Sequence, residues 1–153
     1  MSLLPNALSL KGRALRYLAA REHSRAELER KLAAFEEVPG ELARTLDELQ
    51  AKGFINAQRV VDSVVHRRAS RLGASRIRHE LQGKGLDAQA VQEAVAQLQT
   101  TETERAREVW RKKFGQPATD AASRAKQMRF LAARGFGAEA IHKVVSGADE
   151  ALG

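Results

Sequence analysis

The chain contains 153 residues and carries 26 Lys and Arg against 19 Asp and Glu, which gives a formal net charge of +7. It has no cysteine, and this excludes disulfides, thiolate metal sites and cysteine nucleophiles. Alanine occurs 27 times, Val, Ile and Thr together occur 18 times, and only three prolines interrupt the chain. Because alanine loses no side-chain entropy in a helix whereas β-branched residues do, this composition predicts an all-α protein.

Three short helices are predicted in the first part of the chain, residues 8–54. The middle one begins at Ser24, because Ser24 and Glu27 form a capping-box pattern in which hydroxyl and carboxylate each accept a backbone N–H. The third begins at Val38-Pro39, since proline suits the first helical turn, and ends at Gly53, which is expected to be left-handed. The apolar residues expected on the inward faces of these helices are Leu15, Leu18, Leu28, Leu32, Phe35, Leu42, Leu46 and Leu49.

The same plan is predicted twice more, in residues 55–100 and 101–147, and no segment shows the period-2 alternation of a strand. The expected helices cover residues 56–71, 75–82, 87–98, 102–114, 120–133 and 138–145. Gly73 is expected to end the first of these helices, and Asp87 is expected to cap the third. Trp110 lies at helical spacing from other apolar residues and is predicted to belong to the core rather than to stack on nucleic-acid bases.

An internal match supports this grouping into threes. The turn Lys84-Gly85-Leu86 is matched fifty residues later by Arg134-Gly135-Phe136, and the residues that follow each turn match as well. A period near 50 residues is typical of a helical repeat array, in which each unit buries its apolar face partly against its neighbour. In both turns the glycine and the apolar residue are expected to end a helix with Schellman geometry, which leaves the basic residue free for binding.

Positive charge is concentrated in the second and third parts of the chain. Residues 21–52 carry 6 basic and 8 acidic groups, whereas residues 53–99 carry 7 and 4, and residues 100–153 carry 10 and 7. Basic patches indicate contact with phosphates or with an acidic protein surface, and the alternative is a solvated, arginine-rich helical exterior. The candidate binding residues are Arg67, Arg68, Arg71, Arg76, Arg78, Lys84, Arg111, Lys112, Lys113, Arg124, Lys126, Arg129 and Arg134.

No pattern in the chain indicates catalysis, a cofactor or a metal site. The four histidines lie far apart without ligand spacing, and they are expected to be exposed or to lie beside helix caps. The glycines stand at helix ends rather than in a phosphate loop, and the serines stand mostly at caps. Residues 1–10 lack the basic region and cleavage site of a signal peptide, and no stretch approaches the ~20 apolar residues that span a bilayer. A cytoplasmic protein that is not an enzyme is therefore expected.

Several short motifs follow one another in a specific order over residues 10–147. They are Tyr17–Leu28 with Lys31-Leu32 in the first part, Gly73–Ile77, Glu80-Leu81 and Lys84–Leu86 in the second, and Lys112–Phe114 and Arg129–Phe136 in the third. In order and spacing, this set resembles the RecX family, the bacterial regulators of the recombinase RecA.

The resemblance implies three tandem three-helix repeats, in residues 8–54, 55–100 and 101–147, that form an elongated, curved array. It implies a protein that binds in the groove of the RecA–single-stranded-DNA filament and inhibits ATP hydrolysis, strand exchange and co-protease activity toward the LexA repressor. Such a protein acts in homologous recombination, DNA repair and the SOS response, and we expect it to be monomeric. Phosphate contacts would confer no sequence specificity. Two alternatives stay open, a stand-alone nucleic-acid-binding protein built of helix-turn-helix-like units and a helical scaffold with no nucleic-acid role.

Overall fold

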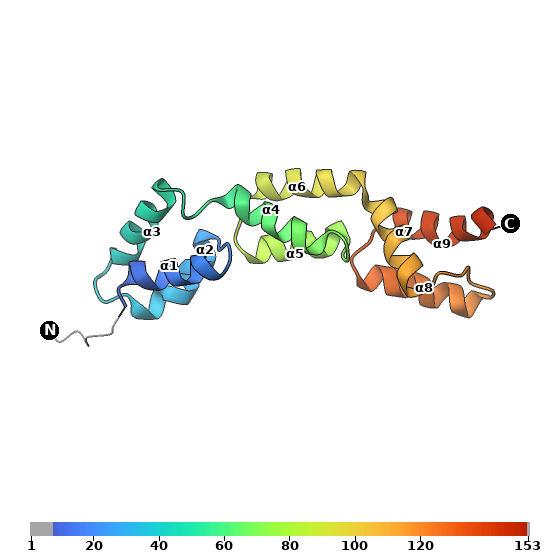
Figure 1. The fold of residues 1–153 in the computed structure, drawn as a ribbon, viewed down its shortest axis with the longest axis horizontal. Helices are drawn as coiled ribbons and strands as arrows, with labels where there is room; N and C mark the ends of the chain where they lie inside the picture. Colours follow the sequence, from blue (N-terminus) through green and yellow to red (C-terminus); the bar gives the residue numbers. More distant parts are fainter. Residues whose placement is uncertain (1–7, 153) are drawn as a thin grey trace. The chain divides into compact units, whose positions relative to one another are not determined.

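The computed structural model describes residues 8–152, and this part of the chain forms nine α-helices, one short 3₁₀ helix and no strand (Figure 1). The elements are α1 (Leu10–Ala20), α2 (Arg25–Leu32), η1 (Ala33–Phe35), α3 (Glu41–Ala51), α4 (Ala57–Arg68), α5 (Ala74–Gly83), α6 (Ala88–Thr100), α7 (Glu102–Lys113), α8 (Ala121–Ala133) and α9 (Ala138–Leu152). The predicted all-α fold class is confirmed. Among the described residues, no helix has the length and apolar character needed to cross a membrane.

Each of the three predicted ranges holds three α-helices. We call these ranges repeat 1 (residues 8–54), repeat 2 (55–100) and repeat 3 (101–147). The last helix, α9, continues past repeat 3 to Leu152. Two expected helix starts are confirmed, because Ser24 and Glu27 form the capping box of α2, and Asp87 caps α6 with its carboxylate.

Contacts divide the chain into two compact units, each made of segments that are separate in the sequence. The first unit contains the residues up to Ser63 together with the turn Lys84–Leu86. The second unit contains Val64–Gly83 and the residues from Asp87 onward. The turn Lys84–Leu86, which lies in the middle of repeat 2, is therefore part of the unit that holds repeat 1.

Leucines of α2 and α3 fill the core of the first unit. Leu28, Leu32, Leu46 and Leu49 are fully buried, and α1 packs on them through its inner face. The helical spacing of these leucines predicts their burial, because residues three and four apart share one face of a helix. Their predicted inward position is confirmed.

Two predictions at the helix ends of the first unit are wrong. Phe35 is 45% exposed rather than inward, because α2 gives way to η1, whose turn of 3.0 residues rotates the ring away from the apolar face of α2. The third helix begins at Glu41 rather than at Val38-Pro39, because Gly40 stands at its N-cap with a left-handed φ of +87°. The predicted left-handed residue after this helix is confirmed at Gly53, whose φ is +83°.

Trp110 belongs to the core of the second unit, as the sequence predicts. It is 7% exposed and packs among apolar residues of α7, α8 and α9. Its Nε1–H donates to Gln127 Oε1 at 2.9 Å, and Gln127 Nε2 in turn donates to the carbonyl of Gln116 at 3.1 Å. The indole is thus packed on its apolar part and satisfied at its polar atom, which is how a buried tryptophan is accommodated.

The two matched turns contain glycines that no other residue could replace without strain. Gly85 and Gly135 have φ values of +70° and +90°, which confirms the predicted left-handed helix ends. Gly135 is also crowded, because an added Cβ would lie 2.3 Å from Arg76 Cγ. The prediction that Gly73 ends a helix is wrong, since α4 ends five residues earlier. Gly73 instead packs against the second turn, where its Cβ would lie 2.3 Å from the Gly135 carbonyl oxygen.

Candidate polyanion-binding surface

Most of the basic residues that the sequence predicts to bind are exposed in the structure. Ten of the thirteen are exposed, and the other three, Arg68, Lys84 and Arg134, are half-buried. All of them except Lys84 lie in the second unit, on α4, α5, α7 and α8 or in the turns that follow α4 and α8. Exposure alone does not select a binding residue, because a cation already paired with a carboxylate offers less charge to a ligand.

Some of these cations are engaged within the protein. Arg68 Nε lies 3.1 Å from one oxygen of Glu80, and Arg67 Nη2 lies 3.8 Å from the other oxygen of the same carboxylate. On α7, Arg111 pairs with Glu108 one turn earlier. These three arginines are therefore weaker candidates for phosphate binding than exposed cations that lack such partners.

Lys84 is not free for binding, contrary to the prediction. Its ammonium lies 3.3 Å from Glu27 Oε1, and the two side chains are only 12% and 8% exposed. Glu27 also accepts from Arg21 Nη2 at 2.7 Å and from the Ser24 N–H at 3.1 Å. Burial alone would raise the pKa of Glu27, but these donors and the charge of Lys84 lower it to about 2. Ser24 Oγ also donates to the Lys84 carbonyl at 2.5 Å, so the turn Lys84–Leu86 is hydrogen-bonded to the start of α2.

Backbone hydrogen bonds hold the matched turn in the second unit instead. The Gly73 N–H donates to the Arg134 carbonyl at 2.8 Å. The position of Glu27 corresponds, 49 residues later, to Arg76, whose Nη1 donates to the Ala133 carbonyl at 2.7 Å. An acid in the first unit is thus replaced by a cation in the second, and the guanidinium of Arg134 has no carboxylate there to pair with.

Arg134 belongs to a group of cations on α8 and beside it that we call the α8 cluster. The cluster consists of Lys113, Lys126, Arg129 and Arg134. Lys126, Phe130 and Arg134 are four residues apart and share one face of the helix, while Lys113 Nζ and Arg134 Cζ lie 5.3 and 4.9 Å from the centre of the Phe130 ring. Within the described part of the chain, no member has a carboxylate within 4.0 Å. Four charges without carboxylate partners, on α7, on α8 and in the turn after α8, suit the phosphates of a polyanion.

Arg105, on α7, is a cation whose role is structural. Its side chain is 13% exposed and donates to the carbonyls of Ala69, Leu72 and Leu98 at 3.0, 2.7 and 2.8 Å. Burial lowers the pKa of this guanidinium. The three carbonyls lie at or just beyond the ends of α4 and α6, where backbone oxygens lack helical partners. Nothing in the local sequence separates Arg105 from its exposed neighbour Arg107, so only the structure assigns this role.

The described residues contain no group of three or more His, Cys, Asp or Glu side chains placed to hold a metal ion. Three of the histidines are exposed, whereas His23 is buried beside the cap residue Ser24. The described part of the chain carries exposed basic residues on a set of three-helix repeats. The fold defines a class, the all-helical proteins built of three-helix repeats.

Comparison with known proteins identifies the family within this class. Three models of the RecX family match successive parts of the chain, the first three-helix domain at residues 11–49, the second at 58–95 and the third at 100–145. The regulatory protein RecX of Leptothrix cholodnii is 57% identical over 93% of this chain and 90% of its own length. That of Ralstonia nicotianae is 48% identical over 99% of this chain and 96% of its own length. The chain belongs to the RecX family.

Solved structures agree on the fold. The crystal structure of RecX from Lactobacillus salivarius matches with a TM-score of 0.75 over 92% of this chain and 95% of that chain, at 20% sequence identity. A second crystal structure of a regulatory protein RecX matches with a TM-score of 0.72 over 90% of this chain and 71% of that chain, at 19% identity. At these identities the likeness shows the fold alone.

Proposed function

We propose that this protein is an inhibitor of the recombinase RecA. In this proposal it binds in the groove of the RecA–single-stranded-DNA filament and reduces ATP hydrolysis, strand exchange and co-protease activity toward LexA. The relatives support a regulatory role, because they are named regulatory proteins. The observation that carries the choice of a nucleoprotein target is the α8 cluster, whose four cations have no carboxylate partners among the described residues.

Phosphate contacts of the α8 cluster have a measurable signature. Each phosphate that a lysine or arginine neutralises releases counterions, so the logarithm of the binding constant falls with the logarithm of salt concentration by about 0.7 per contact on a single strand. Four contacts would contribute a slope of about −3. Because these contacts reach the backbone of the strand rather than base edges, the affinity is expected to be independent of base sequence.

Inhibition in this proposal needs no catalytic group from the regulator. We propose that ATP hydrolysis by RecA depends on the relative orientation of neighbouring protomers in the filament. A bound repeat protein shifts that arrangement only if its affinity differs between the active and the inactive filament geometry. We therefore expect ATP turnover to fall as the filament is occupied, and to stay low at saturating concentrations of the regulator.

The test compares binding to preformed RecA filament, bare single-stranded DNA and bare duplex over a salt series, together with the DNA-dependent ATPase of RecA. The α8-cluster variant Lys126→Gln/Arg129→Gln should bind more weakly, with a salt slope smaller by about 1.4. The matched control is Arg107→Gln/Lys143→Gln, which changes the net charge equally in the same repeat but removes cations already paired with Glu104 and Glu139.

Two results would contradict the proposal. Unchanged ATP turnover at saturating occupancy would exclude inhibition, and equal weakening by the control variant would show that net charge alone matters. Binding to duplex DNA with sequence selectivity, in preference to filament, would support the helix-turn-helix alternative.

A further inference from the structure

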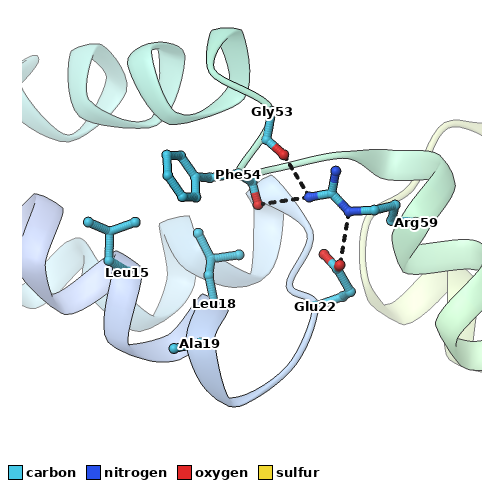
Figure 2. Close-up of a pocket in the computed structure, with 7 residues that line it drawn as sticks. All are labelled: Leu15, Leu18, Ala19, Glu22, Gly53, Phe54 and Arg59. Carbon is cyan, nitrogen blue, oxygen red and sulfur yellow. Dashed lines mark hydrogen bonds and ion pairs between the residues drawn. The ribbon is translucent and has the colours of Figure 1, made fainter.

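An apolar groove with a volume of about 380 Å³ lies on the first unit, within residues 8–63 (Figure 2). Its floor is formed by Leu15, Leu18 and Ala19 of α1. Phe54, in the segment that follows α3, points over these side chains, as Figure 2 shows. The volume is at the lower end of the roughly 300–1,000 Å³ of small-molecule pockets, so the groove suits one or two side chains.

Hydrogen bonds and one ion pair hold the groove in shape. Arg59 Nη2 donates to the carbonyl of Gly53 at 2.6 Å, and Arg59 Nε lies 2.9 Å from Glu22 Oε1 (Figure 2). The Phe54 N–H donates to the carbonyl of Leu49 at 2.9 Å, which ends α3 around the left-handed Gly53. The phenyl ring is therefore held on a fixed backbone. Binding of a partner costs little conformational entropy on the side of the groove, because the groove is already ordered.

Most of the large apolar side chains that are exposed belong to the first unit. Among the described residues five large apolar side chains are exposed, and four of them, Leu8, Phe35, Val38 and Phe54, belong to repeat 1. Phe54 is 46% exposed although it adjoins the half-buried Leu15 and Leu18. A half-exposed aromatic ring on a rigid support is the type of residue that dominates binding energy at protein interfaces.

Charge at the rim of the groove indicates what kind of segment fits. Lys11, one turn before Leu15 on α1, and Lys52, which directly precedes the lining segment after α3, share the single carboxylate of Glu48 at 2.8 and 2.9 Å. The ion pair that closes the other end of the groove is neutral. The rim thus carries net positive charge around an apolar floor.

We infer that this groove docks a protein segment that presents an apolar side chain flanked by carboxylates. Under the proposed function, on which this inference rests, the segment belongs to a RecA protomer of the filament. The first unit then contacts recombinase protein, while the α8 cluster in the second unit contacts DNA phosphates. A bare polynucleotide satisfies the positive rim but leaves the aliphatic floor without an apolar partner.

The test uses two phenylalanines of one repeat that are almost equally exposed. Phe54→Ala removes the ring over the groove, whereas Phe35→Ala removes a ring that is 45% exposed and stacked under the guanidinium of Arg13, outside the groove. Binding of the full-length chain is measured to RecA filament preassembled on single-stranded DNA and, separately, to the bare DNA. We expect Phe54→Ala to weaken filament binding by about tenfold or more and to leave binding to bare DNA unchanged. Phe35→Ala is expected to change neither.

A charge reversal tests the acidic character of the partner segment independently of packing. Lys52→Glu, at the rim cation that directly precedes the lining segment, should weaken filament binding and leave binding to bare DNA unchanged. Arg44→Glu, an equal change at an exposed position of α3 away from the groove, should leave filament binding unchanged. Far-UV circular dichroism of all four variants checks that the helices are intact.

The outcomes separate this inference from the function on which it rests. If the wild-type chain does not bind the filament, the proposed function and the docking site both fail. If the wild-type chain binds but Phe54→Ala behaves like Phe35→Ala, only the docking site fails. Equal weakening of filament and bare-DNA binding by Phe54→Ala would overturn the docking site by assigning Phe54 to nucleic acid instead.

Discussion

Replacing Glu27 by glutamine should destabilise the first unit by removing the charge that holds three partners together. Glu27 is buried and accepts from Arg21 and from the Ser24 N–H, and its carboxylate pairs with Lys84. The pKa of Glu27 is lowered from 4.5 to about 2. At about 1.4 kcal/mol per pKa unit, this shift corresponds to about 3.5 kcal/mol of folding free energy at neutral pH. The Glu27→Gln variant also leaves the ammonium of Lys84, which is 12% exposed, without a counter-charge.

The pH dependence of this loss gives the sharper test. Because the folded state lowers the pKa of Glu27, its contribution to stability is complete above pH 4.5, the unfolded value, and is lost as the pH falls toward about 2. The difference between wild type and Glu27→Gln should therefore shrink over that interval. Urea denaturation at a series of pH values, followed by far-UV circular dichroism, measures it.

Glu29→Gln is the matched control for this prediction. Glu29 lies on the same helix and pairs with Arg25 four residues earlier, but its side chain is 51% exposed. An exposed helical pair of this kind contributes about 0.3–0.5 kcal/mol. Two results would refute the interpretation that the buried charge of Glu27 stabilises the first unit. One is a Glu29→Gln variant as destabilised as Glu27→Gln, and the other is an effect of Glu27→Gln that does not change with pH.

Local signals in the sequence predicted most of the fold. The capping box at Ser24, the cap at Asp87 and the left-handed glycines at positions 85 and 135 each depend on residues within one helical turn, and all are found in the structure. The misplaced ring of Phe35 has a local cause that side-chain periodicity does not encode. Where α2 tightens into the 3₁₀ helix η1, the apolar residues keep their helical spacing in the sequence, but the side chain of Phe35 no longer lies on the apolar face of α2.

The binding surface was less predictable because its decisive contacts join residues far apart in the sequence. Lys84 and Arg134 occupy matched turns and look equivalent, yet Lys84 is neutralised by Glu27, 57 residues earlier. Arg134 remains unneutralised because the position that corresponds to Glu27 holds Arg76. The groove under Phe54 gave no periodic or charge signal at all, since its walls come from a helix and from a segment more than thirty residues later.

Two further predictions concern the glycine turns and the buried histidine. Gly135→Ala should destabilise the second unit by about 2 kcal/mol or more, because its φ is +90° and an added Cβ would collide with Arg76. Gly147→Ala, a helical control with open space at its Cβ, should be neutral or stabilising by about 0.5–1 kcal/mol, and thermal denaturation distinguishes the two. Burial lowers the pKa of His23 below its usual 6.5, and the charges of Arg21 and Lys31 lower it further, although the hydrogen bond from Nδ1 to the Arg21 carbonyl acts in the opposite direction. In the neutral ring, Nε2 accepts from the ammonium of Lys31 at 2.9 Å. Its contribution to stability is therefore complete above pH 6.5 and is lost as the pH falls through its folded pKa, because protonation of Nε2 removes the acceptor and places two cations in contact. Wild type should lose stability as the pH falls below about 6.5, while His23→Asn, less stable at neutral pH, should lose less. Parallel curves for the two proteins would exclude a neutral buried imidazole.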